Sequence, residues 1–111
     1  MFIRAFDEII NANRVTRIWV DAVTNHNTAR IRYSVKLEMS DGQDFNEYTG
    51  VSTPAFRSRY ITDQKEGSGW GSVCYDLVKS MFSAMGNNRN FDVEEWLISR
   101  GMPIEDEPER E

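Results

Sequence analysis

The stretch that decides the fold runs from residue 29 to residue 39 and reads ARIRYSVKLEM. Its apolar residues alternate with charged or polar ones, and successive side chains of a β-strand point to opposite faces of a sheet. The pattern therefore predicts a strand with one buried and one solvent-facing side. The side expected to face the core carries Ile31, Tyr33, Val35 and Leu37. The opposite side carries Arg30, Arg32, Lys36 and Glu38.

The neighbouring segments extend this strand into a sheet. Residues 15–23 are rich in β-branched and aromatic residues and predict a second strand, with a turn over residues 24–28. The Asp-Gly pair at positions 41 and 42 predicts a tight hairpin turn, with residues 43–49 as the returning strand. Pro54 then favours an edge or a loop before a short strand near residues 59–61. Residues 2–10 fit a strand or a helix, and the Asn-rich turn after them favours the strand.

The last third of the chain changes to helical periodicity. Residues 63–71 are rich in Gly and polar residues and predict a flexible connector, after which Ser72 is a candidate helix cap. Apolar residues over positions 74–85 recur at helical spacing and predict one helix, ended by Gly86 and two Asn residues. A second, short helix is expected before Gly101, with Asn90 or Asp92 as its cap.

Strands first and helices last predict an α+β fold. We expect an antiparallel meander of three to five strands, followed by two helices packed on one face of the sheet. A chain of 111 residues is typical of a single domain, here predicted over residues 1–104. Residues 105–111 carry five of the 18 acidic residues and nothing large and apolar to bury, which predicts a disordered acidic tail.

Composition argues against several classes of protein. The chain has one Cys and one His, too few for a Cys/His zinc site or an intrachain disulfide. Its apolar runs are shorter than the roughly 18–20 residues that span a bilayer, and its N-terminus does not resemble a signal peptide. We therefore expect a cytoplasmic protein with no membrane segment, no bound metal and no cofactor.

Catalytic residues receive only weak support. His26 is expected at a turn without an orienting partner, and Cys74 falls on an apolar stripe, where a Cys usually acts as a small hydrophobic residue. The Gly67–Gly71 run before a helix offers N–H groups to an anion, but it lacks the spacing of a phosphate-binding loop. Asp41, Asp44 and Glu47 around the predicted hairpin could supply a pair of catalytic carboxylates, but acids at a hairpin are usually solvated. An enzyme is therefore not expected, and a small enzyme with an anion site at Gly67–Gly71 is the last alternative.

The stronger candidate is a binding surface on the solvent-facing side of the sheet. If residues 15–23 pair with residues 29–39, Trp19 shares this side with several basic residues. Exposed aromatic residues mixed with Arg are enriched at protein interfaces, and they also resemble stacking platforms for single-stranded nucleic acid. The alternative is that the N-terminal segment covers Trp19, or that Trp19 stacks with an arginine of its own chain. The predicted binding residues are Arg17, Trp19, Arg30, Arg32 and Lys36.

These observations predict a non-catalytic, protein-binding accessory domain. Its small size and acidity also fit a phage or mobile-element protein that inhibits a host nucleic-acid-binding machine, because an acidic surface can mimic a phosphate backbone. The alternative is a module that binds single-stranded nucleic acid through the Trp/Arg side of the sheet. The net charge of −5 disfavours it, because contacts to phosphates favour a basic surface.

Overall fold

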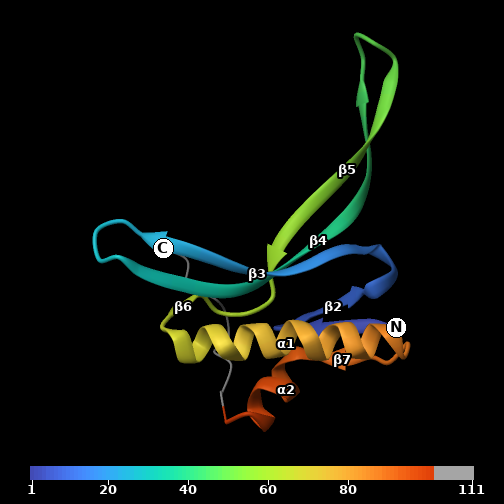
Figure 1. Cartoon of the computed structure of the whole chain (residues 1–111). Coiled ribbons are helices and arrows are strands. Elements are labelled where there is room, and N and C mark those ends of the chain that lie inside the picture. Colours follow the sequence, from blue (N-terminus) through green and yellow to red (C-terminus); the bar gives the residue numbers. More distant parts are fainter. Residues whose placement is uncertain (102–111) are drawn as a thin grey trace.

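Two sheets and two helices make up the computed structural model, which describes residues 1–101 (Figure 1). The larger sheet is antiparallel and contains β3 (Val15–Asn25), β4 (Arg30–Asn46), β5 (Val51–Tyr60) and β6 (Lys65–Glu66). The smaller sheet contains β1 (Phe2–Ala5), β2 (Glu8–Asn11) and β7 (Phe91–Asp92). A short 3-10 helix (Ala12–Arg14) links the sheets, and the two α-helices are α1 (Ser68–Gly86) and α2 (Val93–Ser99). The predicted α+β fold class is confirmed.

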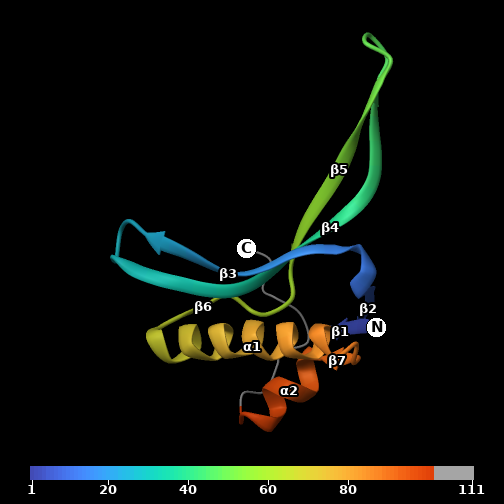
Figure 2. The ribbon, with the colours of Figure 1, turned by 45° about the vertical axis from the view of Figure 1, so that its right-hand side comes forward.

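The core lies between the large sheet and α1, which runs beneath β3 and β4 in both ribbon views (Figures 1 and 2), and it continues into the small sheet and α2. The alternating pattern of β4 holds as predicted at Val35 and Leu37, which are fully buried and pair with Val20 and Ile18 of β3. Burial of each such side chain contributes about 1.5–3 kcal/mol to stability. Tyr33 is only partly buried, and Ile31, which was expected to face the core, is exposed because it lies near the outer end of the β3–β4 hairpin. The helix supplies a stripe at helical spacing, formed by Trp70, Cys74, Leu77 and Met81.

The predicted hairpin turn at Asp41 and Gly42 is wrong, because β4 continues through both residues to Asn46. Ser40 pairs with Phe56 and Gln43 with Pro54, so two residues of β4 face one of β5 and form a β-bulge. Gly42 has a φ of +83°, a conformation that a bulge and a tight turn can both use. The Asp-Gly signal is therefore real, but it marks a bulge.

The chain instead reverses after β4, over residues 47–50. The side chain of Asn46 accepts hydrogen bonds from the backbone N–H groups of Tyr48 (2.9 Å) and Thr49 (3.2 Å), and Gly50 has a φ of +69°. The predicted returning strand over residues 43–49 is therefore wrong, and β5 is much longer than the short strand expected near residues 59–61. Pro54 is tolerated because β5 is an edge strand next to the bulge.

The start of α1 also differs from the prediction. The helix begins at Ser68, so most of the predicted connector over residues 63–71 forms β6 and the first helical turn. Trp70 explains the early start, because its ring is buried and its Nε1–H donates to the carbonyl oxygen of Tyr33 at 2.9 Å. The end of the helix at Gly86 agrees with the prediction.

The N-terminal segment and α2 agree with their predictions. Residues 2–11 are extended rather than helical, as the favoured interpretation expected, but they form two antiparallel strands, β1 and β2, instead of one. Of the two candidate caps of α2, Asp92 is the one that accepts from the N–H of Glu95, at 3.0 Å. The side chain of Asn90 accepts from the N–H of Phe2 instead, at 2.8 Å. The predicted acidic tail, residues 105–111, lies outside the described residues.

Residues 41–56, called the arm below, project away from the rest of the molecule as a two-stranded ribbon (Figures 1 and 2). The pairing of β3 with β4 ends at Met39, and every residue from Asp41 to Pro54 is exposed. The Cα radius of gyration is 15.9 Å, compared with about 13 Å for a compact domain of roughly 100 residues. Within residues 1–101, no helix combines the length and the apolar character needed to cross a membrane.

Candidate protein-binding surface

The side of the large sheet that faces away from α1, called the outer face below, carries all five predicted binding residues. Trp19 pairs with Lys36, and Arg17 pairs with Glu38, while the buried residues of both strands point to the other side. Tyr60 of β5 pairs with Lys36 and so joins the same face. The outer face was expected to be solvent-exposed, but it is so only in part, since Ser34 is buried there and Trp19 is half-buried.

Three of the predicted residues form one cluster with Tyr60. The guanidinium of Arg17 lies over the ring of Trp19, 4.1 Å from its centre, and the Lys36 ammonium lies 4.4 Å from the ring centre of Tyr60. The Tyr60 hydroxyl contacts a carboxylate oxygen of Asp21 at 3.4 Å. Stacking of Trp19 with an arginine of its own chain, the alternative expectation, is therefore what the structure contains. Arg17 already occupies a ring face that a nucleic-acid base would need.

Arg30 and Arg32 lie apart from this cluster. Arg32 pairs with Val23, four residues along β3 from Trp19, or about 13 Å at the rise of a β-strand. Arg30 is at the far end of β4, where its guanidinium lies 3.5 Å from a carboxylate oxygen of Glu66. The five predicted residues thus share one face without forming one site.

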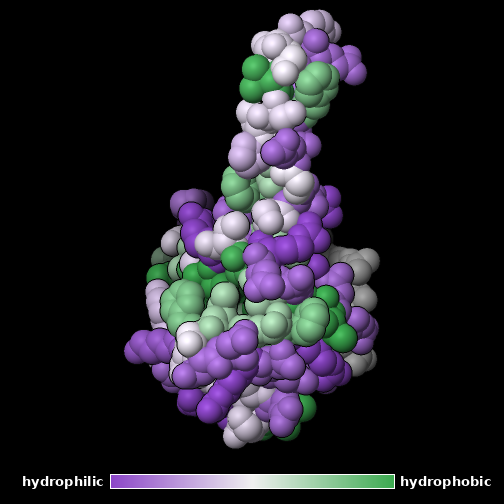
Figure 3. Space-filling model, turned by 90° about the vertical axis from the view of Figure 1, so that its right-hand side faces the viewer, coloured by the Kyte–Doolittle hydropathy of each residue, from purple (hydrophilic) through white to green (hydrophobic). Residues whose placement is uncertain are grey.

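The arm extends this face with apolar residues that the sequence reasoning missed. Pairing of Phe45 with Ser52, and of Ser40 with Phe56, places both Phe residues on the continuation of the outer face. Tyr48 and Val51, at and beside the turn, are also exposed. Figure 3 shows apolar surface reaching the far end of the arm, between polar side chains. A second turn signal, the Asn46-to-Gly50 segment, was present in the sequence but competed with the stronger Asp-Gly pair.

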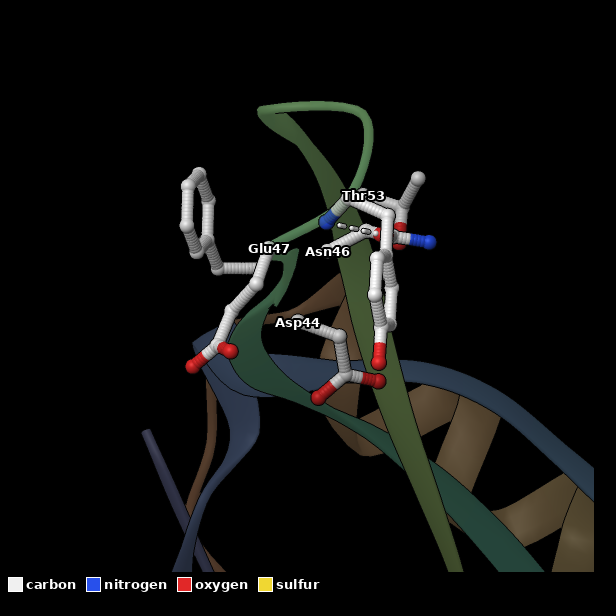
Figure 4. A pocket seen from close by; sticks show the side chains of 6 residues that line it. Asp44, Asn46, Glu47 and Thr53 are labelled. Atoms are coloured by element: carbon white, nitrogen blue, oxygen red, sulfur yellow. Dashed lines mark hydrogen bonds between the residues drawn. The ribbon is translucent and has the colours of Figure 1, made fainter.

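The tip of the arm is acidic. Asp44 and Glu47 border a shallow, open hollow of about 480 Å³, and Figure 4 shows both carboxylates turned away from the end of the arm. In the described part of the chain, neither carboxylate lies within ion-pair distance of a base. Asp41, at the base of the arm, is neutralised by Arg14 (3.6 Å) and Arg57 (3.0 Å).

The residues considered for catalysis do not come together. His26 is exposed in the turn between β3 and β4, whereas Cys74 is fully buried in the core. Burial raises the pKa of the Cys74 thiol to about 12, which leaves it protonated and a poor nucleophile at neutral pH. Among residues 1–101, no group of three or more His, Cys, Asp or Glu side chains is placed to hold a metal ion.

The predicted anion site at Gly67–Gly71 is not a loop, because four of its five residues belong to α1. A hollow of about 430 Å³ lies beside Gly67, but Glu66 and Arg30 line it and form an ion pair with each other. The N–H of Gly67 donates to the carbonyl oxygen of Ile31 at 3.4 Å. A carboxylate at the rim repels an anion, so this geometry does not favour a phosphate.

Comparison with known proteins finds no family model, no curated protein and no solved structure that the chain matches.

Proposed function

We propose that the protein is a non-catalytic, protein-binding module that makes its contacts through the arm and the outer face. The observation that carries the proposal is the arm, which holds Phe45, Tyr48, Val51 and Phe56 exposed on a ribbon against which no helix or third strand of residues 1–101 packs. A two-stranded ribbon is at best marginally stable alone in water. An exposed, aromatic ribbon of this kind is typical of a segment that is covered by another protein.

The cluster around Trp19 supports the same function. Trp, Tyr and Arg are the residues most enriched at the energetic centres of interfaces, and Trp19, Tyr60 and Arg17 lie together on the outer face. Arg17 stacks on Trp19 and Lys36 on Tyr60, and these contacts hold the side chains in place before a partner arrives, which lowers the entropic cost of ordering them on binding.

Binding of single-stranded nucleic acid remains the alternative, and charge separates the two functions. The outer face is basic near Trp19, but the arm beside it presents Asp44 and Glu47, which would repel phosphates. A fluorescence titration with short DNA and RNA oligomers at low and high salt is expected to show no binding. Tight, salt-dependent binding that Trp19→Ala abolishes would favour nucleic acid instead. The narrower expectation of a phage inhibitor rests on small size, acidity and the weak case for catalytic residues, and it stays a prediction.

The experiment that tests the proposal is affinity capture from native lysate with mass-spectrometric readout. Three variants are compared with the wild type: Phe45→Ala with Tyr48→Ala on the arm, Trp19→Ala with Arg32→Ala on the outer face, and Tyr75→Ala with Phe82→Ala on α1. The α1 pair is the matched control, because it also removes two exposed aromatic side chains.

The arm variant is expected to lose specific partners, the outer-face variant to lose the same ones in part, and the α1 variant to retain them. Retention of every partner by the arm variant would contradict the proposal.

A further inference from the structure

The proposed contact surface has acids at the arm tip and bases on the outer face of the same chain. This arrangement indicates which protein binds it. We infer that the partner of the arm is a second copy of this protein, with the arm tip of each protomer lying on the outer face of the other. The inference rests on the proposed protein-binding function and names the partner of that same surface.

Charge complementarity is the first argument. Asp44 and Glu47 at the arm tip have no basic partner in the described part of the chain, and neither Arg17, Arg32 nor Lys36 of the outer face lies within ion-pair distance of a described carboxylate. Two acids, Asp21 and Glu38, lie on the outer face beside these three bases, so the face keeps an excess of one positive charge while the arm tip carries two negative charges. Pairing the surfaces between copies joins opposite charges and helps to fix their orientation.

The shape of the molecule allows the contact to be reciprocal. The arm rises on the side of the sheet opposite α1, which is the side of the outer face (Figures 1 and 2). A two-fold axis can therefore place each arm on the other copy's outer face in the same way. Residues 41–46 span about 20 Å at the rise of a strand, which covers the width of three strands spaced about 4.8 Å apart.

The exposed area is sufficient for a stable dimer. Phe45, Tyr48 and Phe56 are 63%, 99% and 55% exposed, and a fully buried aromatic side chain covers roughly 150–250 Å², so each arm offers on the order of 400 Å² of aromatic surface. Two arms and two outer faces, each contributing about that much, reach the roughly 1,600 Å² of a standard interface.

The test is sedimentation velocity over a concentration series at low and high salt. The wild type is expected to shift from the monomer mass of 12.9 kDa toward twice that value as concentration rises, with weaker association at high salt. Two charge reversals are made: Asp44→Lys with Glu47→Lys on the arm, and Arg17→Glu with Lys36→Glu on the outer face. Each variant alone is expected to be monomeric.

A mixture of the two variants is expected to form dimers again, because both contacts of the mixed dimer then join opposite charges. Lys79→Glu, an exposed reversal on α1, is the control and should sediment like the wild type. Circular dichroism is used to check the fold of each variant, and Asp44 and Glu47 are exposed, so their substitution should leave the core unchanged.

A wild type that remains at 12.9 kDa at every concentration overturns the inference. So does a result in which the arm variant and the outer-face variant each still dimerise on their own. If the chain stays monomeric while lysate capture still depends on the arm, the second copy is wrong as the partner and the protein-binding function stands. If neither self-association nor arm-dependent capture occurs, the inference of a second copy and the proposed protein-binding function are both wrong.

Discussion

Asp92 stabilises two parts of the structure through one carboxylate. One oxygen accepts from the N–H of Glu95 at 3.0 Å and caps α2, and the other accepts from the guanidinium of Arg4 at 2.7 Å, which links α2 to β1. Partial burial acts to raise the pKa of Asp92, but these hydrogen bonds and the charge of Arg4 outweigh it and hold the pKa below its ordinary value.

The first prediction follows from these contacts. Asp92→Ala removes the cap and is expected to lower the free energy of unfolding by about 1–2 kcal/mol, and Asp92→Asn, which keeps an acceptor for the cap, by less. Because the folded-state pKa is lowered, the charge stabilises the protein above the ordinary carboxyl pKa of about 4, and this contribution is lost as pH falls through the folded-state pKa. Urea unfolding should therefore show the gap between wild type and Asp92→Asn closing in acid. An equal gap at neutral and acid pH would contradict the assignment.

Cys74 gives a second prediction at this scale. The thiol is fully buried, and burial raises its pKa to about 12, so it should not react with an aromatic disulfide reagent near pH 8 while the protein is folded. Addition of denaturant should release one equivalent of reactive thiol. Rapid reaction of the native protein would show that this part of α1 opens, and would reopen the question of a nucleophilic cysteine.

Two glycines in the first turns of α1 provide a matched pair for a third prediction. A Cβ at Gly69 would meet no atom within 4 Å, whereas a Cβ at Gly71 would lie 3.1 Å from three ring carbons of Tyr33. Gly69→Ala should raise the free energy of unfolding by about 0.4–1 kcal/mol, because alanine restricts the unfolded chain and favours helix. Gly71→Ala should raise the free energy of unfolding by less, or lower it, and chemical unfolding of both variants measures the difference. Equal increases for the two variants would contradict this prediction and would mean that the Tyr33 ring can move aside without cost.

At the scale of the element, the sequence predicts a strand only where burial imposes a pattern. In residues 33–39 every second side chain is buried or partly buried against the core, so the alternation is visible. No residue from Asp41 to Pro54 is buried, so the outer half of β4 and most of β5 carry no such pattern. The start of α1 was missed for the opposite reason, because the Gly-rich composition hid the tertiary contact of Trp70 with Tyr33.

The arm should be separable from the fold, which is the fourth prediction. Ser40 and Phe56 pair directly across the two strands, so replacing residues 41–55 with Asn-Gly closes the ribbon with a two-residue hairpin turn. No core residue is removed, and the ion pairs of Asp41 are half-exposed surface contacts of little energetic value. Urea unfolding should remain cooperative, with a free energy within about 1 kcal/mol of the wild type. Loss of cooperative unfolding would show that the arm belongs to the folding unit.

At the scale of the whole molecule, strand and helix order predicted the fold class, and residue alternation predicted which side of the sheet carries Arg17, Trp19 and Lys36. The pairing of β1 with β7 was beyond reach, because a two-residue strand has no periodicity. The arm could not be predicted as a binding element either. Its position relative to the outer face depends on the bulge at Asp41 and Gly42, and the same Asp-Gly pair is equally compatible with a tight turn.

The most direct test of the central claim, that the arm and the outer face together form a protein-contact surface, is hydrogen exchange followed by mass spectrometry. It compares dilute protein with concentrated protein or with a captured partner. Free arm amides should exchange rapidly, because no third strand among the described residues pairs with the arm, and association should slow exchange in residues 43–54 and in β3 around Trp19. Slowed exchange confined to α1 and α2, with the arm unchanged, would contradict the claim.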